Sequence, residues 1–155
     1  RAMVSRRTMI KAAVATACIP AAFAARASEP LVVVWKSPTC GCCTDWVRHM
    51  EANGFKVTVN EVQSTAPVRA KMGIPERLGS CHTAAVDGYA LEGHVPAKEV
   101  RRLLRERPQA VGLAVPGMPV GSPGMDGPEY KGRKDPYDVL LVARGGGARS
   151  FESYR

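Results

Sequence analysis

The stretch LVVVWKSPTCGCC, residues 31–43, places a short apolar run directly before three cysteines. The run at 31–35 is rich in β-branched residues and is bounded by Lys-Ser-Pro, which predicts a buried strand. Residues 44–53, followed by a glycine, are predicted to form a helix. Free amides at a helix N-terminus favour the thiolate form of cysteine. The sequence therefore predicts a reactive thiol cluster where a strand ends and a helix begins.

The order of the elements predicted beyond this stretch indicates the fold class. Strands are expected at 56–61, 83–86, 89–92 and 137–143, an edge strand or a frayed end at 148–154, and helices at 67–72 and between Pro96 and Pro108. An order of β-α-β-α-β-β-α, with Cys40 and Cys43 spaced as Cys-x-x-Cys at the first β-α junction, is the thioredoxin topology. We therefore expect an α/β, thioredoxin-like fold with a central mixed sheet flanked by helices. In that topology, the turn that carries Cys81 and His82 lies beside the cysteine cluster.

Residues 1–27 resemble an export signal, which is processed before the protein reaches its final form. The segment SRRTMIK at 5–11 is similar to the twin-arginine consensus, and the alanine-rich run after it is too short to span a membrane. Cleavage is expected after Ala24 or Ala27. An ordinary Sec signal is the alternative, and both routes lead to the bacterial periplasm. We expect residues 28–155 to form a single domain with no membrane contact after the signal is removed.

The charge of the chain is concentrated at its N-terminal end. The 155 residues carry a formal net charge of +8, and five of the 22 basic residues lie within 1–27, where no acidic residue occurs. The remainder has 17 basic and 14 acidic residues, without a basic stripe interleaved with aromatic residues. The composition therefore gives little support to nucleic-acid binding.

Four cysteines remain if Cys18 leaves with the signal: Cys40, Cys42, Cys43 and Cys81. Even numbers of cysteines in an oxidising compartment usually form structural disulfides. Adjacent cysteines, however, bridge each other only with a strained peptide, and a disulfide over four residues closes too small a loop to stabilise much. The spacing therefore favours reactive thiols over structural disulfides.

Soft ligands of three kinds are available for a metal site. The candidate metal ligands are Cys40, Cys42, Cys43, Cys81, His82, Met118 and Met125. Thiolate, thioether and imidazole ligands together suit Cu(I), and so many ligands can hold more than one ion. Cys40 and Cys43 are also the candidate catalytic residues for thiol redox chemistry.

Structural alternatives exist for these candidates. In these alternatives, Cys40 and Cys43 form an ordinary disulfide. Cys81 is then a small buried apolar residue, and His82 caps its turn. The two methionines anchor a loop, 115–125, that is rich in proline and glycine and contains Pro-Gly-Met twice. A closed Cys3His zinc site and an iron–sulfur cluster are the alternative metal assignments.

Two further histidines are assigned structural roles. His49 lies four residues after Asp45 in the first predicted helix, which favours a surface pair between them. His94 directly precedes the start of the last predicted helix. Neither is expected to take part in the candidate site.

Four motifs together resemble the CopG family of periplasmic copper-resistance proteins, long catalogued as a domain of unknown function. They are WKSPTCGCC at 35–43, GSCHT at 79–83, EGHVP at 92–96 and the Pro-Gly-Met loop, and the similarity spans about residues 31–142. The resemblance implies a thioredoxin-like fold and copper binding by Cys40, Cys42 and Cys43. It also implies a role in interconverting Cu(I) and Cu(II) for detoxification.

We therefore expect a periplasmic copper-binding protein that acts in copper resistance. It holds Cu(I) on the thiolate cluster and exchanges electrons with it, as a copper-dependent oxidoreductase would. One alternative is a thiol–disulfide oxidoreductase in which Cys40 is the attacking thiolate. Another is a chaperone that passes copper to an efflux system without catalysis. The expected partners are copper ions and periplasmic efflux or electron-transfer proteins.

Overall fold

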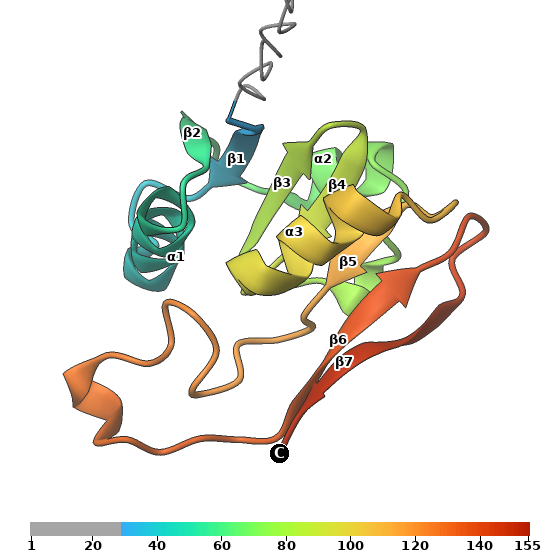
Figure 1. The fold of residues 1–155 in the computed structure, drawn as a ribbon. Coiled ribbons are helices and arrows are strands. Elements are labelled where there is room, and N and C mark those ends of the chain that lie inside the picture. The colour runs from blue at the N-terminus through green and yellow to red at the C-terminus, as the bar shows by residue number, and fades with distance from the viewer. Residues whose placement is uncertain (1–28) are drawn as a thin grey trace, which may run out of the picture.

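The computed structural model describes residues 29–155. Figure 1 shows them as a sheet with helices on both faces and a long loop and hairpin at the C-terminal end. The predicted export signal, residues 1–27, lies outside the described residues. Within 29–155, no helix is long and apolar enough to cross a membrane.

Strands and helices alternate through most of the chain. The elements are β1 (Leu31–Lys36), α1 (Gly41–Ala52), β2 (Lys56–Glu61), α2 (Ala66–Lys71), β3 (His82–Val86), β4 (Tyr89–Glu92), α3 (Ala97–Glu106), β5 (Gly112–Ala114), β6 (Tyr137–Val142) and β7 (Ala148–Tyr154), with short 3-10 helices η1 (Glu76–Leu78) and η2 (Pro128–Tyr130). The order from β1 to α3 is the predicted one. The α1 helix, however, begins at Gly41 and not at residue 44, so that two of the three clustered cysteines lie inside the helix.

The seven strands form one mixed sheet in the order β2-β1-β3-β4-β5-β6-β7. The β1–β2 and β4–β5 pairs are parallel, and the other four neighbouring pairs are antiparallel. The predicted α/β class with a central mixed sheet is therefore confirmed. The finer classification as thioredoxin-like stays a prediction.

Strand β5 and the two 3-10 helices were not predicted from the sequence. Gly112–Ala114 contributes only three residues to the sheet, and all three are buried. A segment of that length has no measurable hydrophobic period, so nothing distinguishes it from a loop in the sequence. It nevertheless joins β4 to β6 and so connects the C-terminal hairpin to the rest of the sheet.

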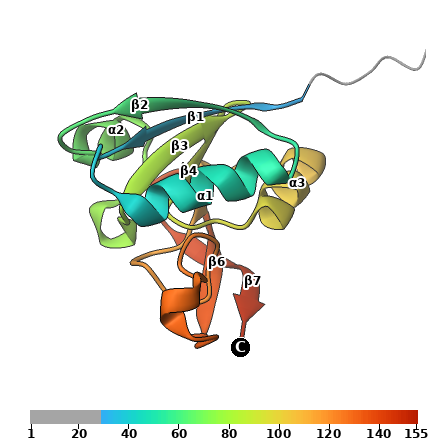
Figure 2. The same cartoon turned by 90° about the vertical axis from the view of Figure 1, so that its left-hand side faces the viewer.

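The apolar core lies on both faces of the sheet. Helices α1 and α3 cover one face and α2 lies on the other, as Figure 2 shows from the side. Trp46 and Met50 of α1 pack with Val34 of β1 in the larger core cluster, and all three side chains are fully buried. The indole Nε1 of Trp46 donates to the carbonyl oxygen of Val95 over 2.8 Å. This hydrogen bond holds the first half of α1 against the segment that leads into α3.

His49 does not form the surface pair that the sequence predicts. Asp45 pairs with Arg48 at 2.7 Å, while His49 Nε2 accepts a hydrogen bond from the backbone amide of Ala97 at 3.0 Å. The imidazole therefore satisfies an amide in the first turn of α3, which has no side-chain N-cap of its own. The helical spacing favoured Asp45, but the tertiary contact with α3 determines where His49 points.

Replacing Leu113 with alanine should test the contribution of β5 to stability. Leu113 is fully buried, so we expect its truncation to lower the free energy of unfolding by about 2–5 kcal/mol. Leu31→Ala is the matched control, because this leucine on β1 is 51% exposed and should lose less than about 1 kcal/mol. Urea unfolding of both variants measures the difference, and equal losses would contradict the assignment of β5 to the core.

Candidate metal centre

The cysteine cluster lies at the N-terminal end of α1. Cys40 is the N-cap residue of the helix, and Cys42 and Cys43 lie in its first turn. Cys40 and Cys43 are joined by a disulfide, with their Cα atoms 5.4 Å apart. Cys42 is a free, half-buried cysteine whose Sγ lies 3.6 Å from Cys40 Sγ. The pairing is the Cys-x-x-Cys one, and it leaves the middle thiol unpaired.

Cys81 completes a group of four sulfur atoms. It lies in the turn before β3, and its Sγ is 3.9 Å from Cys42 Sγ. The Sγ atoms of Cys40, Cys42, Cys43 and Cys81 all lie within 4.8 Å of one another. The prediction that this turn brings Cys81 beside the cysteine cluster is confirmed.

Two histidines extend the cluster on the side of Cys81. The Sγ atom of Cys81 lies 3.4 Å from His82 Nδ1 and 3.0 Å from His94 Nε2. These three residues form a second group whose ligand atoms lie within 4.8 Å of one another. His82 was a candidate from the sequence, whereas His94 was assigned a structural role.

The position of His94 follows from the register of a hairpin. Strands β3 and β4 are antiparallel, and Thr83 pairs with Glu92. Continuing that register by two residues places Cys81 opposite His94. The Asp87-Gly88 turn fixes the register, because a two-residue hairpin turn leaves one pairing of the flanking residues. The sequence therefore contains a signal for the position of His94 beside Cys81, namely its distance from the Asp87-Gly88 turn.

Hydrogen bonds and burial determine the protonation of the two imidazoles. His94 Nδ1 lies 2.8 Å from the carbonyl oxygen of Pro123, so Nδ1 carries the donated hydrogen and Nε2 faces Cys81 as an acceptor. Burial lowers the pKa of His94, and burial together with the nearby His94 lowers the pKa of His82 to about 3. Both rings are therefore neutral at pH 7, which is the form that binds metals. Among the described residues, His82 Nε2 has no hydrogen-bond partner although it is buried.

The thiol of Cys81 is kept protonated in the absence of a metal. Burial raises its pKa to about 12, and negative charge on Cys42 adds to the effect. A metal ion would reverse this preference, because a coordinating thiol loses its proton outright. The two neutral imidazoles beside this thiol can therefore accept a metal cation, whereas two positively charged imidazolium rings would repel it.

Comparisons with known proteins agree with the family resemblance found in the sequence motifs. A family model described as a protein of unknown function, DUF411, matches residues 78–125. A solved structure named copper resistance protein CopG, form 2, is 46% identical with a TM-score of 0.76, and covers 82% of this chain and 99% of its own. Form 1 is 47% identical with a TM-score of 0.74, covering 81% of this chain and 98% of its own. A search of curated proteins gave no match.

The chain belongs to the CopG family. The resemblance stated from the sequence motifs is therefore confirmed at the level of the family. The likeness to the two CopG structures extends over nearly their whole length.

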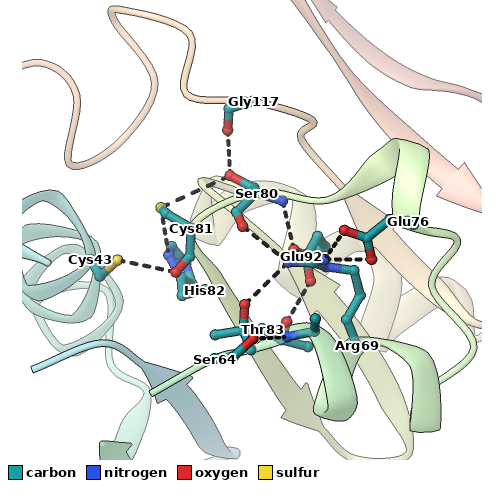
Figure 3. A network of polar contacts seen from close by, with 12 residues as sticks. Cys43, Ser64, Arg69, Glu76, Ser80, Cys81, His82, Thr83, Glu92 and Gly117 are labelled. Atoms are coloured by element: carbon teal, nitrogen blue, oxygen red, sulfur yellow. Dashed lines mark hydrogen bonds and ion pairs between the residues drawn. The ribbon is translucent and has the colours of Figure 1, made fainter. Parts of the chain in front are cut away.

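A buried ion pair holds the turn that carries Cys81 in this CopG-family domain (Figure 3). Glu92 of β4 is fully buried, and its Oε1 accepts hydrogen bonds from Arg69 Nε at 2.9 Å and from the Ser80 amide at 2.7 Å. Its Oε2 accepts from the Thr83 hydroxyl at 2.6 Å. Arg69 also donates to the carbonyl oxygen of Ser80 at 3.2 Å. One carboxylate and one guanidinium thus hold the backbone of Ser80 on one side of Cys81, and the carboxylate also holds the hydroxyl of Thr83 on the other.

The Pro-Gly-Met loop packs against both parts of the cluster. The hydroxyl of Ser80 donates to the carbonyl oxygen of Gly117, and Pro123 accepts from His94. Gly124 adopts a φ of +87°, and a Cβ there would lie 2.5 Å from the carbonyl oxygen of Cys42. Only glycine permits this close approach to the first turn of α1. The loop therefore covers the site through its backbone.

The two loop methionines differ in their surroundings. Met118 is an exposed apolar side chain, whereas Met125 is buried. Its Sδ lies 3.4 Å from the hydroxyl of Tyr130, which belongs to η2. Their assignment as metal ligands stays a prediction, as do the ligand and catalytic roles of the cysteines and of His82.

The buried ion pair should matter far more than an exposed one. Arg69→Ala leaves the Glu92 carboxylate buried without its cation, and we expect a loss of about 3–5 kcal/mol in the free energy of unfolding. Arg48→Ala removes the partner of Asp45 from an exposed pair and should cost less than about 1 kcal/mol. Urea unfolding checks both values, and comparable losses would mean that the network does not hold the turn.

Proposed function

We propose that this CopG-family protein binds Cu(I) and contributes to copper resistance in the bacterial periplasm. The observation that carries the proposal is the convergence of four cysteine sulfurs, from two segments far apart in the sequence, within 4.8 Å. The two similar structures are named copper resistance proteins, which supports the same conclusion. The residues proposed to hold copper are Cys40, Cys42, Cys43, Cys81 and His82, with His94 added on the basis of its position.

The donor set fits copper better than zinc. Thiolate and imidazole are soft or borderline ligands, and Cu(I) prefers thiolates more strongly than harder divalent ions do. A structural zinc site closes with four ligands in a tetrahedron, whereas this site offers six candidate donors in two overlapping groups. On the side of Cys81, His82 presents Nδ1 at 3.4 Å and His94 presents Nε2 at 3.0 Å, so each ring offers a nitrogen to a metal ion bound by this thiol. The number of thiolates supports more than one Cu(I) ion.

The Cys40–Cys43 disulfide supports the further proposal of Cu(I)/Cu(II) interconversion. Forming this disulfide from two thiolates releases two electrons, and each Cu(II) ion takes up one electron on becoming Cu(I). One disulfide thus balances two copper ions, in either direction. A site that holds copper and a reversible dithiol side by side needs no additional cofactor for this exchange.

The same disulfide favours a second candidate function, a thiol–disulfide oxidoreductase. Cys40 is more accessible than Cys43, which is fully buried, so Cys40 is the sulfur that a partner thiol would meet. In this alternative Cys42 and Cys81 have no necessary role. A copper chaperone that serves an efflux system shares the copper ligands but makes no use of the disulfide.

A competition titration should separate copper binding from zinc binding. We expect the reduced protein to bind Cu(I) more tightly than Zn(II), because its ligands are soft. Competition against chelators of known affinity under anaerobic conditions measures both affinities. Preferential retention of zinc would contradict the copper assignment.

Cys42→Ser separates copper binding from plain disulfide exchange in the same assay. A multi-thiolate site loses one ligand in this variant and should bind Cu(I) at least about tenfold more weakly. Even replacing a residue that only hydrogen-bonds to a metal ligand lowers metal affinity by about 10–100-fold. An oxidoreductase that uses Cys40 and Cys43 keeps its activity in this variant. Unchanged Cu(I) affinity would favour the oxidoreductase.

Replacing both loop methionines with leucine tests their predicted role as ligands or lid. Met118→Leu with Met125→Leu keeps most of the apolar volume and should cost less than about 1.5 kcal/mol at each site. The affinity for Cu(I), or the rate at which air oxidises it, should nevertheless change. Met72→Leu is the matched control, because Met72 packs in the smaller core cluster with Ile74 and Leu78. Copper behaviour equal to that of the control would identify the two methionines as loop anchors.

A further inference from the structure

We propose that the four cysteines form an internal relay in which the disulfide moves from Cys40–Cys43 to Cys42–Cys81. Cys42 is the intermediate, because its sulfur lies within 4 Å of both Cys40 Sγ and Cys81 Sγ. The exchange goes beyond the proposed copper function, since it needs no metal and stands on the positions of the sulfur atoms alone.

The distances favour transfer through Cys42. Its Sγ lies 3.6 Å from Cys40 Sγ and 3.9 Å from Cys81 Sγ. A disulfide bond is about 2.0 Å long, so either new bond requires the sulfurs to approach by about 2 Å. Rotation of the cysteine side chains, which are only partly buried at Cys42 and Cys81, supplies movement of that size.

Cys43, the third cysteine at this end of α1, is a poorer partner for Cys42 than Cys81 is. Cys43 is held with its Sγ 3.7 Å from the backbone oxygen of Cys81, and its sulfur is fully buried. A bridge between Cys42 and Cys43 would strain the peptide that joins these adjacent residues. The two free cysteines among the described residues, Cys42 and Cys81, are therefore the pair that accepts the disulfide.

The relay has two balanced steps. The Cys42 thiolate attacks Cys40 Sγ, forming a Cys40–Cys42 bond and releasing the Cys43 thiolate. The Cys81 sulfur then attacks Cys42 Sγ as its proton passes to His94 Nε2, forming the Cys42–Cys81 bond and releasing the Cys40 thiolate. Cys42 and Cys81 each lose a proton, and Cys40 and Cys43 each gain one. No oxidant or reductant is consumed, because one disulfide is present before and after.

The surroundings of Cys81 favour its role as the resolving thiol. Its sulfur faces His94 Nε2 at 3.0 Å, and the Pro123 carbonyl holds that ring with Nε2 as the acceptor. The Cys81 S–H is thereby directed to an acceptor, while the turn itself is held by Glu92 and Arg69. The result is a regenerated Cys40/Cys43 dithiol that can be oxidised again, so the cluster stores two disulfides.

Disulfide mapping of the full chain without metal tests the relay. Cys18→Ser is introduced throughout so that only the four cysteines of the cluster remain. The reduced protein receives one equivalent of diamide, the reagent is removed, and samples are acid-quenched, alkylated and digested with trypsin over time. Cleavage after Lys36, Arg48, Arg77 and Lys98 puts Cys40, Cys42 and Cys43 on one peptide, 37–48, and Cys81 on another, 78–98.

The relay predicts that a cross-link between these two peptides grows while the disulfide within 37–48 declines. Two free thiols per molecule remain throughout, and their alkylated positions shift to Cys40 and Cys43. The cross-link should be independent of protein concentration, and a second equivalent of diamide should leave no free thiol. Absence of the cross-link in the wild-type cluster, with Cys81 alkylated at every time, would overturn the proposal.

The matched control is Cys42→Ser, with Cys42→Ala as a second variant in case the first does not fold. Both retain the Cys40–Cys43 disulfide but lack the intermediate sulfur, so the cross-link should fall by about tenfold or more. A cross-link that forms equally well without Cys42 would also overturn the relay, because Cys81 would then react directly with Cys40 or Cys43. Since copper is absent, none of these outcomes decides whether the site binds copper, which the competition titration tests separately.

Discussion

The buried carboxylate of Glu92 is the constraint on which the geometry of the site depends. A carboxylate removed from water is stable only when charge and hydrogen bonds compensate its lost hydration. Here the compensation comes from Arg69, from the Ser80 amide and from the Thr83 hydroxyl, which belong to three different parts of the chain. Satisfying this single group therefore forces α2, the turn before β3 and β4 into one arrangement.

That arrangement places Cys81 where the cysteines of α1 can meet it. The α1 helix brings its N-terminus to the same end of the sheet because Trp46 and Met50 must be buried against β1. The loop at 115–125 lies against both the Cys81 turn and the N-terminus of α1. The carbonyl oxygen of Pro123 accepts a hydrogen bond from His94, and Gly124 lies against the backbone of Cys42. The sulfur cluster is thus assembled by apolar burial on one side and by a buried ion pair on the other. Neither of these forces involves the sulfur atoms themselves.

Much of this could be predicted from the sequence, because the relevant signals are local. The apolar run at 31–35 and the Asp87-Gly88 turn each predict their element without reference to the rest of the chain. The cysteine spacing at a strand–helix junction predicts the position of the thiol cluster. The approach of Cys81 followed from the order of elements and was correct.

The features that were missed depend on tertiary contacts. Strand β5 is too short to have a hydrophobic period, and His49 is directed by an amide of α3 that is distant in sequence. Arg69 and Glu92 look like ordinary surface charges, since nothing in their neighbouring residues indicates that they meet in the core. His94 is the exception, because counting outward from the predicted turn would have paired it with Cys81.

The two chemistries proposed for the sulfurs of this site compete with each other. A thiolate binds a soft metal strongly, whereas forming a disulfide removes two thiolates from the ligand set. With Cys40 and Cys43 oxidised, the remaining thiols are Cys42 and Cys81, and Cys81 is flanked by two imidazoles.

With the disulfide between Cys42 and Cys81, the remaining thiols are instead Cys40 and Cys43 at the helix N-terminus, and the imidazoles lose their thiolate neighbour. The first set mixes sulfur and nitrogen and suits copper in either oxidation state, while the second contains sulfur alone and favours Cu(I). The position of one disulfide would therefore determine which oxidation state of copper the protein retains, without any change in the number of electrons it holds.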